Sequence, residues 1–130
     1  MKIIPFKKSY YEEVCEWWKE HGWEPLKENM LTTEGYVVEE DGTKIVCGWF
    51  VRTNSLTALL EWIVGNPKVE GKKLYEALDM LENHVCKIAD ESGYEMLLTF
   101  LEHINLQKFL NSKGWIDAER KIDVYTKRLS

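Results

Sequence analysis

Hydrophobic and polar residues follow two different spacings along this chain, which predicts a protein built from both strands and helices. Apolar residues at every second position are typical of a half-buried strand, whereas apolar residues three or four positions apart mark one face of a helix. Residues 40–43 form a hairpin turn signal between two of the expected strands. The expected strands are residues 2–6, 35–40, 44–52, 58–64, 94–101, 115–118 and 122–129.

Three segments carry the helical spacing, and each has a recognisable start or stop signal. Ser9 and Glu12 fit a capping box, so the first helix is expected to begin there and to stop near Gly22. Residues 105–113 predict a last helix that Gly114 closes. The longest helix is expected to start at Leu74 and to end at residues 90–93, with its apolar stripe at Leu74, Leu78, Leu81, Val85 and Ile88.

The order of these elements is strand–helix, two strands, strand–helix–strand–helix, two strands. Without a repeat or linker, this order predicts one domain over residues 1–130. We expect an α/β (α+β) fold with one mixed, mostly antiparallel sheet of about six to seven strands and helices on both faces.

Composition narrows the function classes. The 130 residues carry a net charge of −5, which argues against nucleic-acid binding through clustered basic residues. No apolar run approaches the roughly 20 residues of a membrane helix, and no signal peptide is visible. The three cysteines form no CxxC pair, which suits reduced thiols in a cytoplasmic protein. The three histidines lie in different elements without a second ligand nearby, so no metal site is expected.

The segment 58–81 carries the main chemical signal. An apolar strand runs through a loop with glycines and lysines, residues 65–73, into the long helix. The first N–H groups of a helix lack intrahelical partners, and the positive end of its dipole attracts anions. The loop is therefore either a phosphate-binding site or a plain connection.

The order of elements, with this strand–loop–helix unit, resembles the GNAT superfamily of acetyl-CoA-dependent N-acyltransferases. The resemblance covers nearly the whole chain. It extends to short phage-encoded members of the superfamily. Its local features are Asn66-Pro67 after the apolar strand, Gly71-Lys72 before the long helix, and the late helix ending Asn111-Ser112-Lys113-Gly114-Trp115.

The resemblance implies acetyl-CoA as the co-substrate. The phosphate loop of the family, Gln/Arg-x-x-Gly-x-Gly/Ala, aligns with residues 68–73. Lys68 stands at the basic position and Gly71 is kept, but Lys73 replaces a small residue, and Glu70 would repel a phosphate. The pyrophosphate would rest on Gly71, Lys72, Lys73 and Leu74, and the thioester would lie near Ile63 and Val64.

The resemblance also implies where the catalytic groups lie. Glu61 is the expected general base, because a carboxyl in an otherwise apolar strand is partly buried and its pKa is raised. The alternative is a solvated Glu61, or one paired with Arg52. The family's general-acid tyrosine falls on Leu110, so His103 or Tyr125 would protonate the leaving thiolate, or the thiolate would leave unaided.

The acceptor wall is expected around the first helix, from Trp18, Trp23 and Glu24. Trp17 and Trp18 are adjacent, so one of them is expected to be half exposed. That exposure would suit an acceptor wall or a protein-binding patch, while core packing is the alternative use. An acidic region there would favour a cationic acceptor such as a lysine, a polyamine or an aminoglycoside, and the alternative is a solvated helix face. The acidic residues are Glu12, Glu13, Glu16, Glu20 and Glu24.

The leading hypothesis is a cytoplasmic N-acetyltransferase, a monomer or homodimer, that acetylates an amine of a small molecule or protein. If the chain is viral, it would work in the host cytoplasm. A second hypothesis keeps the fold without the chemistry, as a phage-encoded binding or inhibitor protein aimed at a host factor. A third, a DNA-directed member of the superfamily, is disfavoured by the net charge.

Overall fold

The computed structural model describes residues 1–101, 103–117 and 125–129. The chain divides into two compact units, Met1–Phe100 and Leu101–Ser130, and each is described by itself. The expectation of one domain over residues 1–130 stays a prediction.

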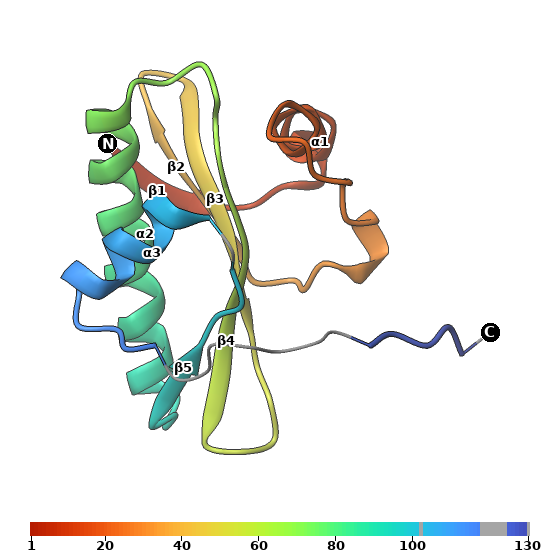
Figure 1. Ribbon diagram of the computed structural model, residues 1–130, viewed down its shortest axis with the longest axis vertical. Helices are drawn as coiled ribbons and strands as arrows, with labels where there is room; N and C mark the ends of the chain where they lie inside the picture. Colours follow the sequence, from red (N-terminus) through yellow and green to blue (C-terminus); the bar gives the residue numbers. More distant parts are fainter. Residues whose placement is uncertain (102, 118–124, 130) are drawn as a thin grey trace. The chain divides into compact units, whose positions relative to one another are not determined.

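The first unit is built on a five-stranded sheet in the order β1-β2-β3-β4-β5 (Figure 1). Neighbouring strands are antiparallel, except that β4 and β5 are parallel. The mixed, mostly antiparallel sheet is confirmed, but the expected six to seven strands are too many, because the described residues form five. The strands are β1 Lys2–Pro5, β2 Gly35–Glu40, β3 Thr43–Val51, β4 Thr57–Gly65 and β5 Met96–Leu98.

The predicted turn between β2 and β3 is confirmed. Asp41 and Gly42 both have a positive φ, 50° and 80°, as the commonest two-residue hairpin turn requires. Aspartate and glycine tolerate this backbone region better than other residues do, so the local sequence selects the hairpin.

Helices α1 (Tyr11–Glu20) and α2 (Gly71–Glu91) cover opposite faces of the sheet (Figure 1). Helix α2 is the crossover that the parallel β4–β5 pair requires. The core under α2 includes Leu81 and Val85 with Val46 and Leu60 of the sheet. The core under α1 contains Val14, Trp17, Trp18, Val37, Cys47, Trp49 and Val64.

Both helix starts differ from the prediction. A short 3-10 turn over Lys8–Tyr10 contains Ser9, and Tyr10 is the residue before α1, so the capping box is wrong. Helix α2 begins at Gly71 rather than Leu74, so three residues expected in the loop form its first turn. The rest of α2 follows its predicted apolar stripe, and Gly93, with φ of 87°, follows its end.

The last elements are shorter than expected. Strand β5 has three residues instead of the expected 94–101. In the second unit, α3 spans Ile104–Ser112, and Gly114 (φ 90°) follows it as predicted. Residues 115–117 and 125–129 are not strands, so the expected terminal hairpin is not seen there; residues 118–124 lie outside the described residues. No helix in the described part of the chain is long and apolar enough to span a bilayer.

Gly35 should be important for the stability of the fold, because the indole of Trp49 lies directly over it. A Cβ on Gly35 would come within 2.3 Å of Trp49 Nε1 and 2.9 Å of Phe6 Cβ. We expect Gly35→Ala to lower the unfolding free energy by about 1–3 kcal/mol, the usual effect of overpacking a core. Urea unfolding measures it. The matched control is Gly71→Ala, whose Cβ meets nothing within 4 Å; equal midpoints for the two variants would contradict the packing described here.

Candidate active site

A β-bulge in β4 defines the candidate site. Cys47 of β3 pairs with Val64 and Trp49 pairs with Glu61, so Trp62 and Ile63 together stand opposite Gly48. Trp62 takes a φ of +57°, a region that bulky residues rarely adopt. The extra residue therefore has a defined backbone cost, and it changes which way the following side chains point.

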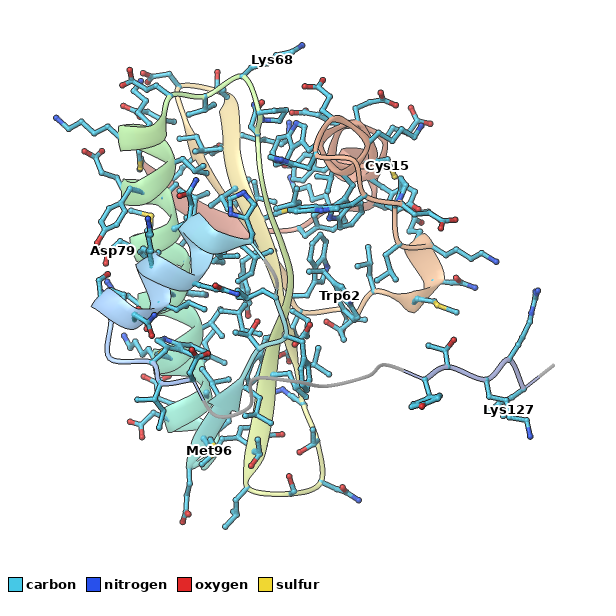
Figure 2. The ribbon with its side chains drawn as sticks, viewed as in Figure 1. Cys15, Trp62, Lys68, Asp79, Met96 and Lys127 are labelled. Carbon is cyan, nitrogen blue, oxygen red and sulfur yellow. The ribbon has the colours of Figure 1, made fainter. Side chains whose placement is uncertain are left out.

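The bulge reverses the inside–outside alternation of β4. Before it, Ala58 and Leu60 belong to the core under α2. After it, Trp62 and Val64 pack in the core under α1. Glu61 pairs with Trp49, whose indole is in the α1-side core, so Glu61 faces that side too. Glu61 and Trp62, although consecutive, thus lie on one face, and Figure 2 shows Trp62 on the α1 side of the sheet.

Beside the bulge, β4 loses its pairing with β5. The last matched pair is Leu59 with Leu98, whereas β4 continues to Gly65. Beyond it, the Phe100 N–H donates to Glu61 Oε1 at 3.1 Å. A side chain, rather than the backbone of β4, therefore meets the chain that follows β5. Within the described residues, the edge of β4 over residues 60–65 has no β5 partner.

Glu61 is half-buried, as its apolar neighbours predict. Burial raises the pKa of its carboxyl to about 7, and the hydrogen bond from Phe100 lowers the pKa by a smaller amount. The alternative pairing with Arg52 is not formed, because Arg52 Nε donates to Glu34 Oε1 at 2.8 Å. The other carboxylate oxygen, Glu61 Oε2, accepts no hydrogen bond from the described residues. It is also not one of the buried side-chain atoms that lack a partner, so it is accessible to solvent.

At the end of β4, a fixed turn leads into α2. The Asn66 N–H donates to Ile45 O, its side-chain amide donates to Lys44 O, and its Oδ1 accepts from the Lys68 N–H. Asn66 therefore holds the end of β4 against β3. Figure 2 shows Lys68 at the tip of this turn.

The first turn of α2 is open to an anion. The side chain of Glu70, the residue before the helix, makes no capping hydrogen bond. The amides of Gly71, Lys72 and Lys73 are those that a helix start leaves without intrahelical partners, and all three residues are exposed. Gly71 has an ordinary φ and an unobstructed Cβ position, so the fold itself does not require a glycine there.

The charges around this turn are mixed. Lys73, at the position where the family prefers a small residue, lies 3.6 Å from Glu40 in a partly exposed ion pair. Lys68 is exposed, and so is Glu70. Leu74 packs its side chain toward Gly65 instead of the surface: a Cβ at Gly65 would lie 2.6 Å from Leu74 Cδ1.

The expected exposure of Trp17 or Trp18 is wrong, because both are buried, at 4% and 5% exposed. Trp18 stacks on Trp49 at 5.8 Å between ring centroids. The other flank of α1 is covered by the following loop, whose Leu26 packs on the same core and accepts a hydrogen bond from Tyr11. Adjacent tryptophans can both be buried where the sheet covers one flank of a helix and a loop covers another.

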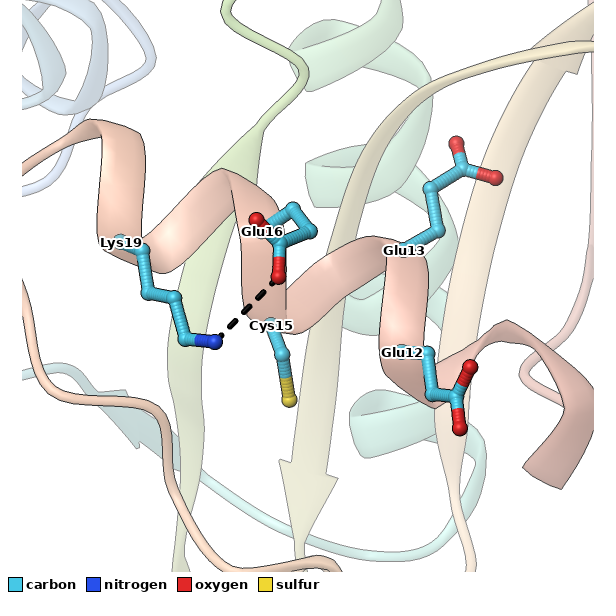
Figure 3. Close-up of a pocket in the computed structure, with 5 residues that line it drawn as sticks. All are labelled: Glu12, Glu13, Cys15, Glu16 and Lys19. Atoms are coloured by element: carbon cyan, nitrogen blue, oxygen red, sulfur yellow. Dashed lines mark hydrogen bonds and ion pairs between the residues drawn. The ribbon is translucent and has the colours of Figure 1, made fainter.

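The other predicted acceptor residues lie at the surface. Trp23 is 41% exposed and stacks on His21, whose Nε2 lies 3.0 Å from Gly65 O. Glu24 is exposed. An open depression on α1 is lined by Glu12, Glu13, Cys15, Glu16 and Lys19 (Figure 3). Glu16 is paired with Lys19 and Glu13 with Lys44, so neighbouring lysines already meet part of this negative charge.

The predicted proton donors lie in the second unit. His103 is the residue before α3, and its Nδ1 accepts from the Leu106 N–H at 3.4 Å. Tyr125 is 89% exposed, and Leu110, at the family's tyrosine position, is buried. The roles of His103 and Tyr125 as proton donors stay predictions.

Sequence reasoning missed Trp62 and Phe100. Glycine inside a strand often marks a bulge, and Gly48, opposite Trp62, is that signal. Phe100 had no signal, because its part is played by a backbone amide.

The raised pKa of Glu61 makes stability depend on pH. Between about pH 4.5 and 7 the folded protein binds a proton that the unfolded chain does not, so stability falls as pH rises through that window. We expect Glu61→Gln to raise the unfolding free energy at pH 8 by about 1–3 kcal/mol relative to the native chain, less than the full shift because the carboxylate is partly solvated. Denaturant unfolding at pH 5 and pH 8 measures this. The exposed Glu12→Gln is the control; a Glu61→Gln effect equal at both pH values would contradict the burial argument.

Comparison with known proteins supports the fold. No family model and no curated protein matches the sequence. A mutant protein from Thermus thermophilus superposes with a TM-score of 0.73 at 18% identity, covering all of both chains. An aminoglycoside N-acetyltransferase in complex with CoA gives 0.70 at 20% identity, over 98% of this chain and 100% of that one. A Trypanosoma brucei acetyltransferase gives 0.66 at 15% identity, over 96% and 99%. The chain therefore has the GNAT-like fold that its sequence predicts, the fold of these solved acetyltransferases.

Proposed function

We propose that the protein is an N-acetyltransferase that transfers an acetyl group from acetyl-CoA to an amine. The observation that carries the proposal is the loss of β4–β5 pairing beside the Trp62 bulge, with Glu61 on that edge and the open start of α2 beyond the C-terminal end of the same strand. One strand thus connects an anion site with a carboxylate whose pKa is about 7.

The residues present fit the phosphate end of acetyl-CoA. Gly71, Lys72 and Lys73 are exposed residues, and the side chain of Glu70 does not cap their amides. Lys68 and Lys72 add positive charge. The solved aminoglycoside N-acetyltransferase of this fold holds CoA, which supports the assignment. The unpaired edge of β4 near Ile63 and Val64 would hold the thioester end, and the bound group would supply an activated acetyl carbonyl.

Glu61 would act as the general base. An amine must lose its proton to form an amide, and Glu61 Oε2 is the carboxylate oxygen left available to take it. A base with a pKa near the working pH is both deprotonated often enough and basic enough for this role. The backbone N–H of Phe100 fixes the carboxylate in place. His103 and Tyr125 stay the candidates for protonating the leaving thiolate.

The structure weakens one reason for the alternative hypothesis of a binding protein without catalytic activity. It drew support from the surplus of tryptophans, but Trp17, Trp18 and Trp49 are core residues.

Binding of acetyl-CoA is expected to depend on Gly71. We expect Gly71→Trp to remove the affinity for acetyl-CoA and CoA, because an indole would cover the helix amides without disturbing the fold. Titration calorimetry measures this, with circular dichroism as the folding check. The matched control is Glu91→Trp at the other end of the same helix. Undiminished affinity in Gly71→Trp would move the phosphate site elsewhere.

Turnover is expected to depend on Glu61 and on pH. We expect kcat/KM to rise to a plateau with an apparent pKa near 7, because only the carboxylate form accepts a proton. Glu61→Gln should lower kcat by about 10²–10⁴-fold while the Kd for acetyl-CoA stays unchanged. The assay follows CoA thiol release with ethylamine, 2-phenylethylamine and spermidine, and Glu12→Gln is the control. A native rate in Glu61→Gln would exclude Glu61 as the base.

A further inference from the structure

The acceptor side of Glu61 has an unusual composition. Trp62 follows Glu61 in sequence and lies on the same face because of the bulge. Phe100 bonds to Glu61 through its backbone, and its side chain is 57% exposed. The carboxylate is therefore accompanied by an aromatic residue on β4 and by another on the chain beyond β5.

The backbone at Trp62 indicates that its side chain has a use there. A bulky residue at a φ of +57° costs about 1–3 kcal/mol, and such costs are concentrated at functional sites. Glycine would adopt this conformation without strain. The indole partly offsets the cost by packing edge-on against Trp49, at 6.4 Å between centroids, yet it remains only half-buried.

The acidic side chains of α1 do not supply further negative charge beside Glu61. Glu12, Glu13 and Glu16 line the exposed depression on α1 (Figure 3), while the α1 residues that face the sheet are Val14, Trp17 and Trp18. Glu34 belongs to the opposite face, where it pairs with Arg52. Among the described residues, no other carboxylate contributes to the raised pKa of Glu61, whose causes are burial and the hydrogen bond from Phe100.

We infer that the acceptor is a monoamine carried on an aromatic body, an arylalkylamine, with its ammonium at Glu61 Oε2 and its ring against Trp62 and Phe100. This inference rests on the proposed function. A single carboxylate matches a single positive charge, and the indole attracts both an ammonium group and an aromatic ring. A polyamine would leave its remaining charges facing apolar side chains, with no carboxylate among the described residues placed to compensate their desolvation.

The test follows the indole Nε1–H signal of Trp62 in the ¹⁵N-labelled protein, assigned by its loss in Trp62→Phe. We expect the Kd obtained from this shift to be at least about tenfold lower for 2-phenylethylamine than for ethylamine, 2-phenylethanol or spermidine. Ethylamine lacks the ring, 2-phenylethanol lacks the charge, and spermidine carries more than one charge. Equal binding of ethylamine or spermidine, or an unmoved Trp62 signal, overturns the inference.

Variants give the second arm. Trp62→Ala should weaken 2-phenylethylamine by about fivefold to thirtyfold. Phe100→Ala should also weaken the binding of 2-phenylethylamine. Because the Phe100 ring is largely exposed, this variant should stay folded even if Trp62→Ala does not. The matched control is Met96→Ala, an exposed apolar residue at the other end of β5. Unchanged affinity in both aromatic variants overturns the inference.

The two proposals fail in different ways. Acetyl transfer to spermidine with none to 2-phenylethylamine would confirm an N-acetyltransferase and overturn the aromatic acceptor. A selective shift of Trp62 by 2-phenylethylamine without acetyl transfer to any amine would support the aromatic-amine site and overturn the proposed function.

Discussion

The site depends on one extra residue in β4. Side chains of a strand alternate with a period of two, so one inserted residue moves every later side chain to the other face. In β4 this change happens between Leu60 and Ile63, and it gives the α1 face two consecutive side chains, Glu61 and Trp62. The strand after the bulge also lacks β5 as a partner. Without the bulge, Trp62 and Val64 would point toward α2.

Several features of this region are energetically unfavourable for folding. Glu61 is held where burial raises its pKa, and Trp62 has a strained backbone. Nearby, Trp49 Nε1 is a buried donor without a partner among the described residues. A buried unpaired donor typically costs about 1–3 kcal/mol. Stacking of Trp49 on Trp18 and its tilted contact with Phe6 offset part of this cost. Strain gathered where a strand parts from its neighbour is what one expects of a site shaped for a ligand rather than for stability.

Local signals made much of the fold predictable. The Asp41-Gly42 turn and the stripe of α2 are each determined by a few neighbouring residues, and both are confirmed. The start of α2 was misplaced because glycine and two lysines read as a loop, and no capping residue marks the helix start. The burial of Trp17 and Trp18 was missed because the loop that carries Leu26 covers α1, a tertiary contact that no spacing reveals.

In the candidate site, too, only the residue with a local sequence signal was predictable. Glu61 was found because a lone carboxyl in an apolar strand is a local pattern, and its partial burial follows. The role of Phe100 was invisible, since its N–H acts and every residue except proline has one. Trp62 looked like one more apolar residue, because the bulge that turns it to the α1 face is signalled only across the sheet, by Gly48.

The same contrast between backbone and side-chain contacts explains how the proposed phosphate loop, residues 68–73, can differ from the family's pattern. At the start of α2 the proposed ligand contacts are backbone amides, which exist whatever side chains the first turn carries. Lys73 departs from the family pattern, but its ammonium is directed to Glu40, so its side chain does not need to cover those amides. Gly71 is kept, and its Cβ position is open to solvent. At the bulge in β4 the proposed contacts are side chains, so a change of residue there would change what is bound. In the proposed enzyme the co-substrate would therefore be constrained by the backbone of α2, and the acceptor by residues such as Trp62.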